Sequence, residues 1–248
     1  MRRRIYFFIS VIWILSAGPF AFGLELRFSA GSANYQFEGA GSSPTNLWES
    51  KPIYPREPYV ELELRTRSDV DKPYLRSELE YLGGRRVQET PQAVVRRLET
   101  WVAYFGWGWR MPLGLSFEVG PMGVSQRHFL EDPGSTQKIN RAITRLGNYF
   151  GAFYNHAFGP WELGAASAIG ILGFPQRQSA VSEIEFTFDR IFSGGAWALG
   201  AKIKTGLLQL EKDSNNLETL GTTADAITFF RQGETDTKIY MLTARRAL

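Results

Sequence analysis

The sequence predicts an all-β protein, an antiparallel barrel whose strands cross a membrane, and three observations lead to this prediction. Apolar and polar residues alternate along many segments of the chain, as they do in β-strands. The polar members of these segments are often charged, and they would share one face of a sheet. The chain also begins like a secreted protein, so lipid is the expected solvent outside the sheet and the charged face would line a lumen.

The start of the chain has the pattern of a signal peptide. Residues 2–4 are all Arg, Ile5 to Leu15 is an apolar run too short to span a bilayer, and Ala21-Phe22-Gly23 supplies small residues at the usual cleavage spacing. We therefore interpret residues 1–23 as a signal peptide that carries the protein across the inner membrane. A cut after Gly18 and an uncleaved anchor are the alternatives.

Residues 24–248 form a single domain in this interpretation, because no linker or composition shift divides them. The chain has no Cys, which excludes both a lipid-modified cysteine at the cleavage site and a disulfide framework. Its formal net charge is +3, and the arginines of the signal peptide contribute to it, so we expect no nucleic-acid partner. No stretch after residue 23 is apolar enough for a membrane helix.

The clearest hairpin lies between residues 182 and 205. Apolar residues alternate with acidic residues in its first arm and with lysines in its second arm. A two-residue turn at 193–194 would place Glu185 opposite Lys202, and a turn one residue later would place it opposite Lys204. Either turn gives one apolar face and one charged face.

Ten strands are expected, with eight or twelve as alternatives. Residues 222–232 are interpreted as an excursion of the last loop, because counting them as a strand would give eleven, and single-chain bacterial barrels have even numbers. In a hairpin over 96–120 that turns around Trp107-Gly108-Trp109, the first arm also fits a short helix over 92–105. The other strands are expected at 24–30, 60–65, 75–81, 143–158, 161–171 and 237–248.

Loop lengths alternate between long and short along the chain, as in outer-membrane barrels with short periplasmic turns and long external loops. The long loops are expected at 39–58, 121–141 and 211–236. Aromatic residues flank the short turns, and a soluble β-sandwich, the alternative fold, gives no reason to gather tryptophans in one ring. The expected aromatic girdle consists of Trp107, Trp109, Phe158, Trp161, Phe192 and Trp197.

The signal peptide, the hairpins over 24–248 and the final strand, residues 237–248, together resemble the small bacterial outer-membrane β-barrel proteins. This resemblance implies a place in the outer membrane of a Gram-negative bacterium, with the membrane lipid and the barrel-assembly machinery as partners. Members of this group usually end on an aromatic residue that the assembly machinery recognises. This chain departs from that pattern, because it ends on Leu248 after two arginines.

The predicted lumen residues carry charges of both signs. Because buried charges must be paired, they are expected to form a structural plug of ion pairs. The alternative is a narrow, porin-like channel that admits small polar solutes between acidic and basic walls. Gly164, Ala166, Ala168 and Gly170 either leave space inside, which favours the channel, or let a plug or a neighbouring strand approach closely. The predicted lumen set is Glu61, Glu63, Arg65, Arg67, Arg76, Glu78, Glu80, Glu183, Glu185, Asp189, Lys202 and Lys204.

Two other classes of function stay open. The long loops are candidates for surface binding or adhesion, with Trp48, Tyr54, Phe129, Phe229 and Phe230 as candidate contacts. A hydrolase would need an activated nucleophile or water, and the two histidines, His128 and His156, lie in no motif of the omptin proteases or the lipid A deacylases. His128 with Glu131 and Asp132 is only a weak metal-ligand pattern, so no metal and no cofactor are expected.

Overall fold

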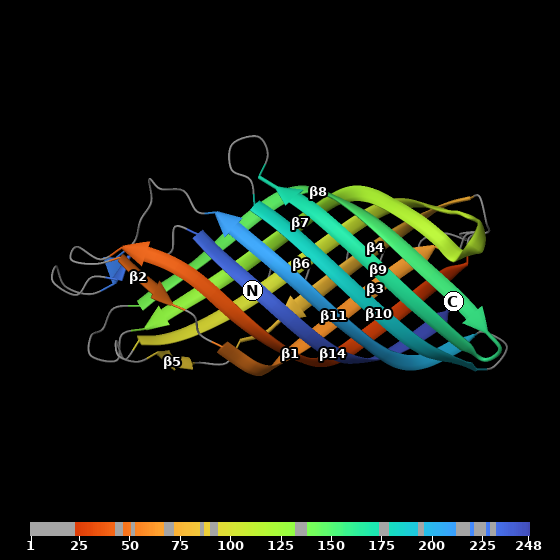
Figure 1. Cartoon of the computed structure of the whole chain (residues 1–248), viewed down its shortest axis with the longest axis horizontal. Helices are drawn as coiled ribbons and strands as arrows, with labels where there is room; N and C mark the ends of the chain where they lie inside the picture. Colours follow the sequence, from red (N-terminus) through yellow and green to blue (C-terminus); the bar gives the residue numbers. More distant parts are fainter. Residues whose placement is uncertain are drawn as a thin grey trace.

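The computed structural model of the chain shows a closed antiparallel β-barrel of ten strands (Figure 1). The predicted fold class and strand number are confirmed. Three of the predicted features lie outside the described residues: residues 1–22 of the expected signal peptide, the lumen residue Arg67, and the turn at 193–195. The structure describes residues 23–42, 47–50, 53–66, 72–84, 87–89, 94–131, 138–173, 179–192, 196–211, 219–220, 227–228 and 232–248.

Each barrel strand pairs with its neighbour in chain order, and the last strand pairs with the first, which closes the ring. Closure leaves no edge strand in the ring, so each of its ten strands has a partner on both sides. The ten strands are β1 (Leu24–Ser42), β3 (Ile53–Thr66), β4 (Pro73–Leu82), β6 (Val94–Arg110), β7 (Leu115–Glu131), β8 (Lys138–Phe158), β9 (Trp161–Leu172), β10 (Ser179–Phe192), β11 (Trp197–Glu211) and β14 (Gln232–Ala247).

Four short strands lie outside the ring. β2 (Leu47–Ser50) pairs with β1, and β5 (Val87–Glu89) pairs with β6. β12 (Thr219–Leu220) and β13 (Ile227–Thr228) pair only with each other, which agrees with the predicted excursion of the last loop. Among the described residues, no helix is long and apolar enough to cross a membrane.

The pairing of β10 with β11 corrects the first of the two predicted registers. Glu185 lies opposite Lys204, and Thr187 lies opposite Lys202. This is the register of the later turn, and it pairs Phe192 with Trp197 at the end of the hairpin. A cross-strand aromatic pair at this position stabilises that register over the other.

The hairpin of β6 and β7 corrects two further expectations. Residues 92–105 do not form a helix in their described part, and the chain does not turn at Trp107-Gly108-Trp109, because β6 continues to Arg110. The turn lies at a short 3-10 element, η1 (Pro112–Gly114), where Leu113 has a φ of 64° and Gly114 a φ of 82°. Trp107 and Trp109 therefore sit on a strand, on its outer face.

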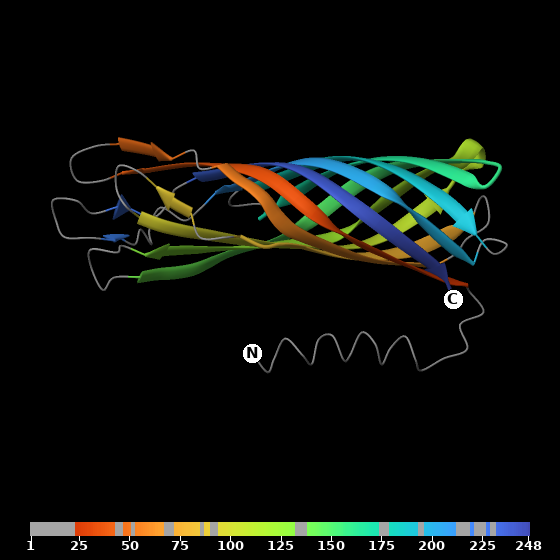
Figure 2. The same ribbon diagram turned by 90° about the horizontal axis from the view of Figure 1, so that it is seen from below.

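The strands are longer than the sequence pattern indicates. β7 runs to Glu131 and β8 begins at Lys138, so most of the expected loop over 121–141 is paired strand. Much of the expected loops over 39–58 and 211–236 is also strand. In Figures 1 and 2 these extensions project at the end opposite the short turns. The alternation of apolar and polar residues fades in these extensions while backbone pairing continues, so their sequence resembles that of a loop.

The outer surface is divided into an apolar belt and a polar collar. Large apolar side chains are exposed around the barrel near the short turns, a surface that suits lipid and not water. Further along the strands, most outward residues are polar and exposed, including Ser32, Asn34, Thr144, Thr205 and Lys238. The belt includes Phe28, Leu75, Phe105, Val119, Phe150, Leu163, Ile169, Phe186, Leu199, Ile203 and Leu242.

This division predicts a position-dependent cost for a charge on the outer face. Leu242 is 75% exposed within the belt, so Leu242→Arg should lower the free energy of unfolding in lipid vesicles by about 2–4 kcal/mol. Thr144→Arg places the same side chain in the collar, at an exposed position of β8 paired with Ser125, and should cost about 0–1 kcal/mol. Urea titrations, followed by the gel shift between folded and unfolded forms, would measure both. Equal small losses would contradict a lipid-facing belt.

Candidate functional site

The candidate site is the lumen inside the apolar belt, where charged side chains from opposite walls meet. Alternation along β3, β4, β10 and β11 turns one side chain in two inward. Of the predicted lumen residues, those that the structure describes face inward; Glu183, Glu185 and Arg65 are half-buried and the others are buried. The buried group is Glu61, Glu63, Arg76, Glu78, Glu80, Asp189, Lys202 and Lys204.

Lys202 links two walls of the barrel. Its Nζ lies 2.6 Å from Oε1 of Glu61 on β3 and 2.9 Å from Oε2 of Glu185 on β10. The Ser29 hydroxyl also donates to Oε1 of Glu61, at 3.1 Å. Lys202 is only 1% exposed and Glu61 is fully buried, so solvent does not stabilise either charge, and the ion pairs must do so.

Lys204 forms a second linkage, one pair of residues further along β11. Its Nζ lies 2.8 Å from Oε2 of Glu183 and 3.9 Å from Oε1 of Glu78, and it also forms an ion pair with Glu80. Although Glu185 is its direct backbone partner, Lys204 reaches Glu183 diagonally. The predicted pairings of Glu185 with Lys202 and Glu183 with Lys204 therefore exist as side-chain contacts despite the shifted register.

Arg76 on β4 gathers carboxylates from several strands. Its Nε lies 3.3 Å from Oε1 of Glu63, a terminal nitrogen lies 3.3 Å from Oε2 of Glu118, and Glu78 forms an ion pair with it. Five N–H donors in a planar fork let one guanidinium serve several acceptors. The Tyr149 hydroxyl adds a hydrogen bond to Oε2 of Glu118, at 3.1 Å.

Several charged residues near the short turns belong to the lumen but are absent from the predicted set, among them Arg27, Glu118, Glu162 and Arg245. Arg27 lies 2.8 Å from Asp189, and Glu118 contacts Arg76. Arg245 donates two hydrogen bonds to the carboxylate of Glu162, at 2.9 and 3.0 Å. Arg27, Glu118 and Glu162 lie on the polar side of alternating segments, so extending the same pattern would have found them. Arg245 follows the apolar Ile239 and Met241 on the inner face of β14, so alternation does not single it out.

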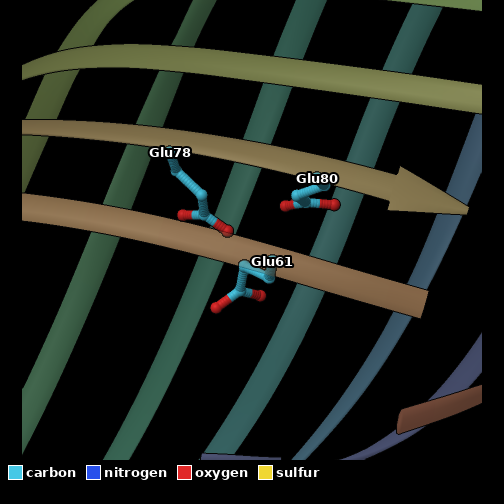
Figure 3. Close-up of side chains that lie close together, drawn as sticks. All are labelled: Glu61, Glu78 and Glu80. Atoms are coloured by element: carbon cyan, nitrogen blue, oxygen red, sulfur yellow. The ribbon is translucent and has the colours of Figure 1, made fainter. Parts of the chain in front are cut away.

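Three carboxylates lie close together in the middle of the network. Figure 3 shows Glu61, Glu78 and Glu80 converging from β3 and β4, and one oxygen of each lies within 4.8 Å of the others. Such a spacing suits a bound cation. Here the ammonium groups of Lys202 and Lys204 already supply the positive charge, because they pair with Glu61 and Glu80.

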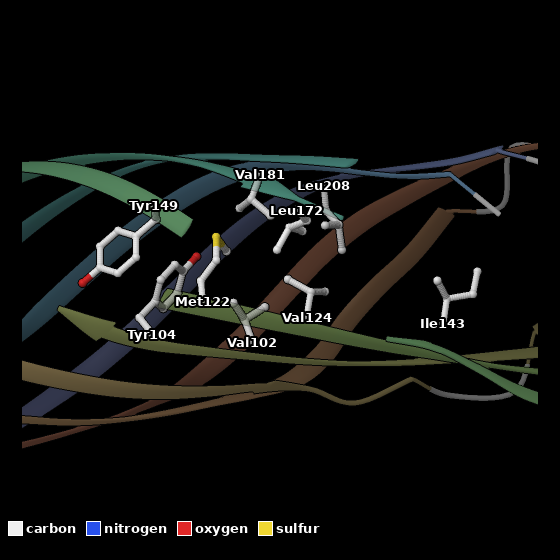
Figure 4. Packing of buried hydrophobic residues seen from close by; sticks show 9 residues of the cluster. All are labelled: Val102, Tyr104, Met122, Val124, Ile143, Tyr149, Leu172, Val181 and Leu208. Carbon is white, nitrogen blue, oxygen red and sulfur yellow. The ribbon is translucent and has the colours of Figure 1, made fainter. Parts of the chain in front are cut away.

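Toward the collar the lumen becomes apolar. Figure 4 shows one cluster in which Val102, Met122, Val124, Leu172 and Val181 project inward from different strands. A second cluster, beside β1 and β3, includes Tyr35, Tyr59, Leu82, Leu98 and Ile239. The barrel thus changes its pattern along its length. In the belt it is charged inside and apolar outside. In the collar it is largely apolar inside, with buried polar residues such as Thr100, Gln126 and Thr235, and mostly polar outside.

The inward-facing small residues leave little free volume. A Cβ added at Gly106 would lie 2.0 Å from the Tyr149 hydroxyl, and one at Gly170 would lie 2.0 Å from the Met122 sulfur. Large side chains of other strands therefore fill the space that the glycines vacate. Three cavities in the described lumen have volumes of about 20, 40 and 30 Å³, room for one to three water molecules each.

The six predicted girdle residues all lie on the outer face near the short turns. Trp107 and Trp109 stack with ring centroids 5.1 Å apart, and Trp197 is exposed beside the described end of β10. His156 lies on the same face, with its ring 6.3 Å from those of Tyr154 and Phe158. These positions suit an interface with lipid headgroups, and the role of the girdle stays a prediction.

The candidate loop residues lie mostly outside the described side chains. His128, Trp48 and Tyr54 are on strands whose side chains at these positions are not described, and Glu131, Asp132, Phe229 and Phe230 are likewise not described. Phe129 lies on β7, with the guanidinium groups of Arg97 and Arg127 at 5.5 and 5.2 Å from its ring centroid. The weak metal pattern at His128 therefore stays untested.

A closed ring of paired strands, a charged interior and an apolar exterior occur together in this chain. The fold is that of the bacterial outer-membrane β-barrels. No model of a known protein family matches the sequence, and no curated protein matches it either.

Solved structures with similar architecture include three bacterial barrels. The outer membrane protease OmpT of Escherichia coli has a TM-score of 0.48 and 9% identity, covering 94% of this chain and 100% of its own. The attachment invasion locus protein Ail of Yersinia pestis, in complex with a heparin analogue, has a TM-score of 0.40 and 9% identity. The match covers 90% of this chain and 98% of Ail. The translocator domain of the autotransporter NalP of Neisseria meningitidis has a TM-score of 0.42 and 7% identity. The match covers 100% of this chain and 95% of the NalP domain.

Removing the ammonium group of Lys202 should destabilise the barrel strongly. Lys202→Met leaves Glu61 and Glu185 without this cation, and an uncompensated buried charge costs about 3–5 kcal/mol. Lys238→Met, which removes an exposed charge on the collar, should change the free energy of unfolding by less than about 0.5 kcal/mol. Urea unfolding in vesicles would compare the two variants.

Adding Glu61→Gln to Lys202→Met should restore part of the loss, because one unpaired carboxylate is removed. If Lys202→Met is as mild as Lys238→Met, the ion pairs do not hold the walls together.

Proposed function

We propose that the protein is a structural barrel of the Gram-negative outer membrane whose lumen is closed, so that it anchors and presents its collar without conducting solutes. The observation that supports this proposal is that side chains fill the lumen in two successive parts. Ion pairs fill the part inside the belt, and apolar clusters fill the part inside the collar. Cavities that hold only a few water molecules offer no continuous path for a hydrated solute.

The proposal includes an orientation and a route to the membrane. The short turns and both ends of the mature chain would face the periplasm, as is usual for such barrels, and the collar would face the outside. Cleavage after Gly23 by signal peptidase would release the mature chain, and the barrel-assembly machinery would insert it. The apolar belt, which needs lipid around it, supports the outer membrane as the destination.

Single-channel recording in planar bilayers tests the closed lumen. The refolded chain from Leu24 onward, first shown to be folded by its gel shift on heating, should give no steady conductance. Glu185→Gln should also be silent, because the apolar clusters still close the collar. A porin added afterwards to the same bilayer would verify that channels can be detected.

Steady conductance of the unchanged protein that shifts on Glu185→Gln, or on Lys202→Met in any sample that folds, would overturn the proposal. It would establish the narrow channel for small polar solutes instead.

Surface binding is the second candidate, and the length of the strands favours it. β7 and β8 carry paired backbone well beyond the apolar belt, which builds a rigid collar under the loops. Recognition commonly resides in loops held by such a scaffold. Protease treatment of whole cells should then remove binding to host surfaces or matrix components while the barrel stays in the membrane. Binding that survives complete loop removal would exclude this role.

A further inference from the structure

Two arginines on the outer face near the short turns alternate with aromatic rings. Arg190 on β10 has its guanidinium carbon 5.5 Å from the ring centroid of Trp161 and 5.1 Å from that of Phe192. Arg246 on β14 lies 4.9 Å from the centroid of Trp197. Pairing joins these residues across four strands, since Arg190 pairs with Trp161 and Trp197 pairs with both Phe192 and Arg246. We call these five residues the arginine–tryptophan band.

The band lies where lipid headgroups would meet the barrel. Next to it along the strands, the belt residues Phe188, Leu199 and Leu242 are exposed and apolar. On its other side the strands end, and β14 stops at Ala247. Tryptophan rings favour this boundary between hydrocarbon and water, so the two guanidinium groups stand at headgroup level.

Neither arginine of the band has an acidic partner among the described residues. The nearest carboxylates along these strands, Asp189 and Glu162, face the lumen, where they pair with Arg27 and Arg245. Arg97, at the other end of the barrel, also lies over a ring but forms an ion pair with Glu99. The band is therefore a surface with two positive charges and no internal counterion in the described part of the chain.

We propose that the arginine–tryptophan band binds the phosphate of an anionic phospholipid headgroup in the leaflet at the short-turn end. A guanidinium donates paired N–H groups that match two oxygens of a phosphate, and weak hydration makes it suited to an interface. The rings limit the orientations of the guanidinium groups, and the adjoining belt receives the acyl chains. An anionic headgroup fits better than a zwitterionic one, because no ammonium group offsets its phosphate near Arg190 and Arg246.

Brominated lipids test this with a local readout. In the chain from Leu24 onward, which lacks Trp13, with the tryptophans at 48, 101, 107 and 109 replaced by Phe, fluorescence comes from Trp161 and Trp197. Quenching by brominated phosphatidylglycerol and by brominated phosphatidylcholine in mixed vesicles gives the relative binding constant at the band. The unchanged band should prefer phosphatidylglycerol, and Arg190→Gln or Arg246→Gln should each reduce the preference roughly fivefold. Arg190→Lys should keep part of it.

Lys238→Gln is the matched control, because it removes one exposed positive charge from the outer face of β14 at the collar. It should leave the preference at Trp161 and Trp197 unchanged, as should an excess of inorganic phosphate. An equal loss in Lys238→Gln would mean a net-charge effect, and loss with inorganic phosphate would mean a site for the free anion. Either result, or full preference in both glutamine variants with normal gel shifts, would overturn the proposal.

Discussion

The requirement that buried charges be paired governs the interior of this barrel. Lys202 and Lys204 project from β11 toward carboxylates on β3, β4 and β10. Their ion pairs therefore cross the lumen and are not confined to neighbouring strands. Removing a charge from water is costly unless a partner is close. The positions of these partners fix the distance between opposite walls, and the backbone pairing of the strands fixes the circumference.

Much of this arrangement could be predicted, because polar and apolar residues alternate clearly wherever one face of a strand meets lipid and the other meets the charged lumen. Inside the belt, lipid on one side and charge on the other keep Glu61, Glu78 and Lys202 in phase with apolar neighbours, so strands and faces follow from the sequence. The choice between two turns only one residue apart could not be made, since both place charges with charges. The structure adopts the register in which Phe192 and Trp197 are cross-strand partners.

The collar escaped prediction for the opposite reason. Its outer face suits water, so polar residues such as Asn34 and Thr144 occupy positions that hold Phe or Ile in the belt. Its inner face is largely apolar, with Val124 and Leu172 almost fully buried. Where inside and outside exchange polarity along one strand, the pattern loses its phase and looks like loop. The two zones together explain why the strands are long and why different kinds of side chain fill the two parts of the lumen.

The paired contact of Arg245 with Glu162 has a consequence for how the ring comes together. The two residues lie on β14 and β9, which β10 and β11 separate along the sheet, so their side chains meet only when the sheet has curled. A flat or partly paired sheet would leave both charges without each other. The last strand, which also pairs with the first strand, therefore carries an ion pair that stabilises only the fully curved sheet. The Arg245 guanidinium, near the end of the chain, thus favours the closed barrel over partly paired states.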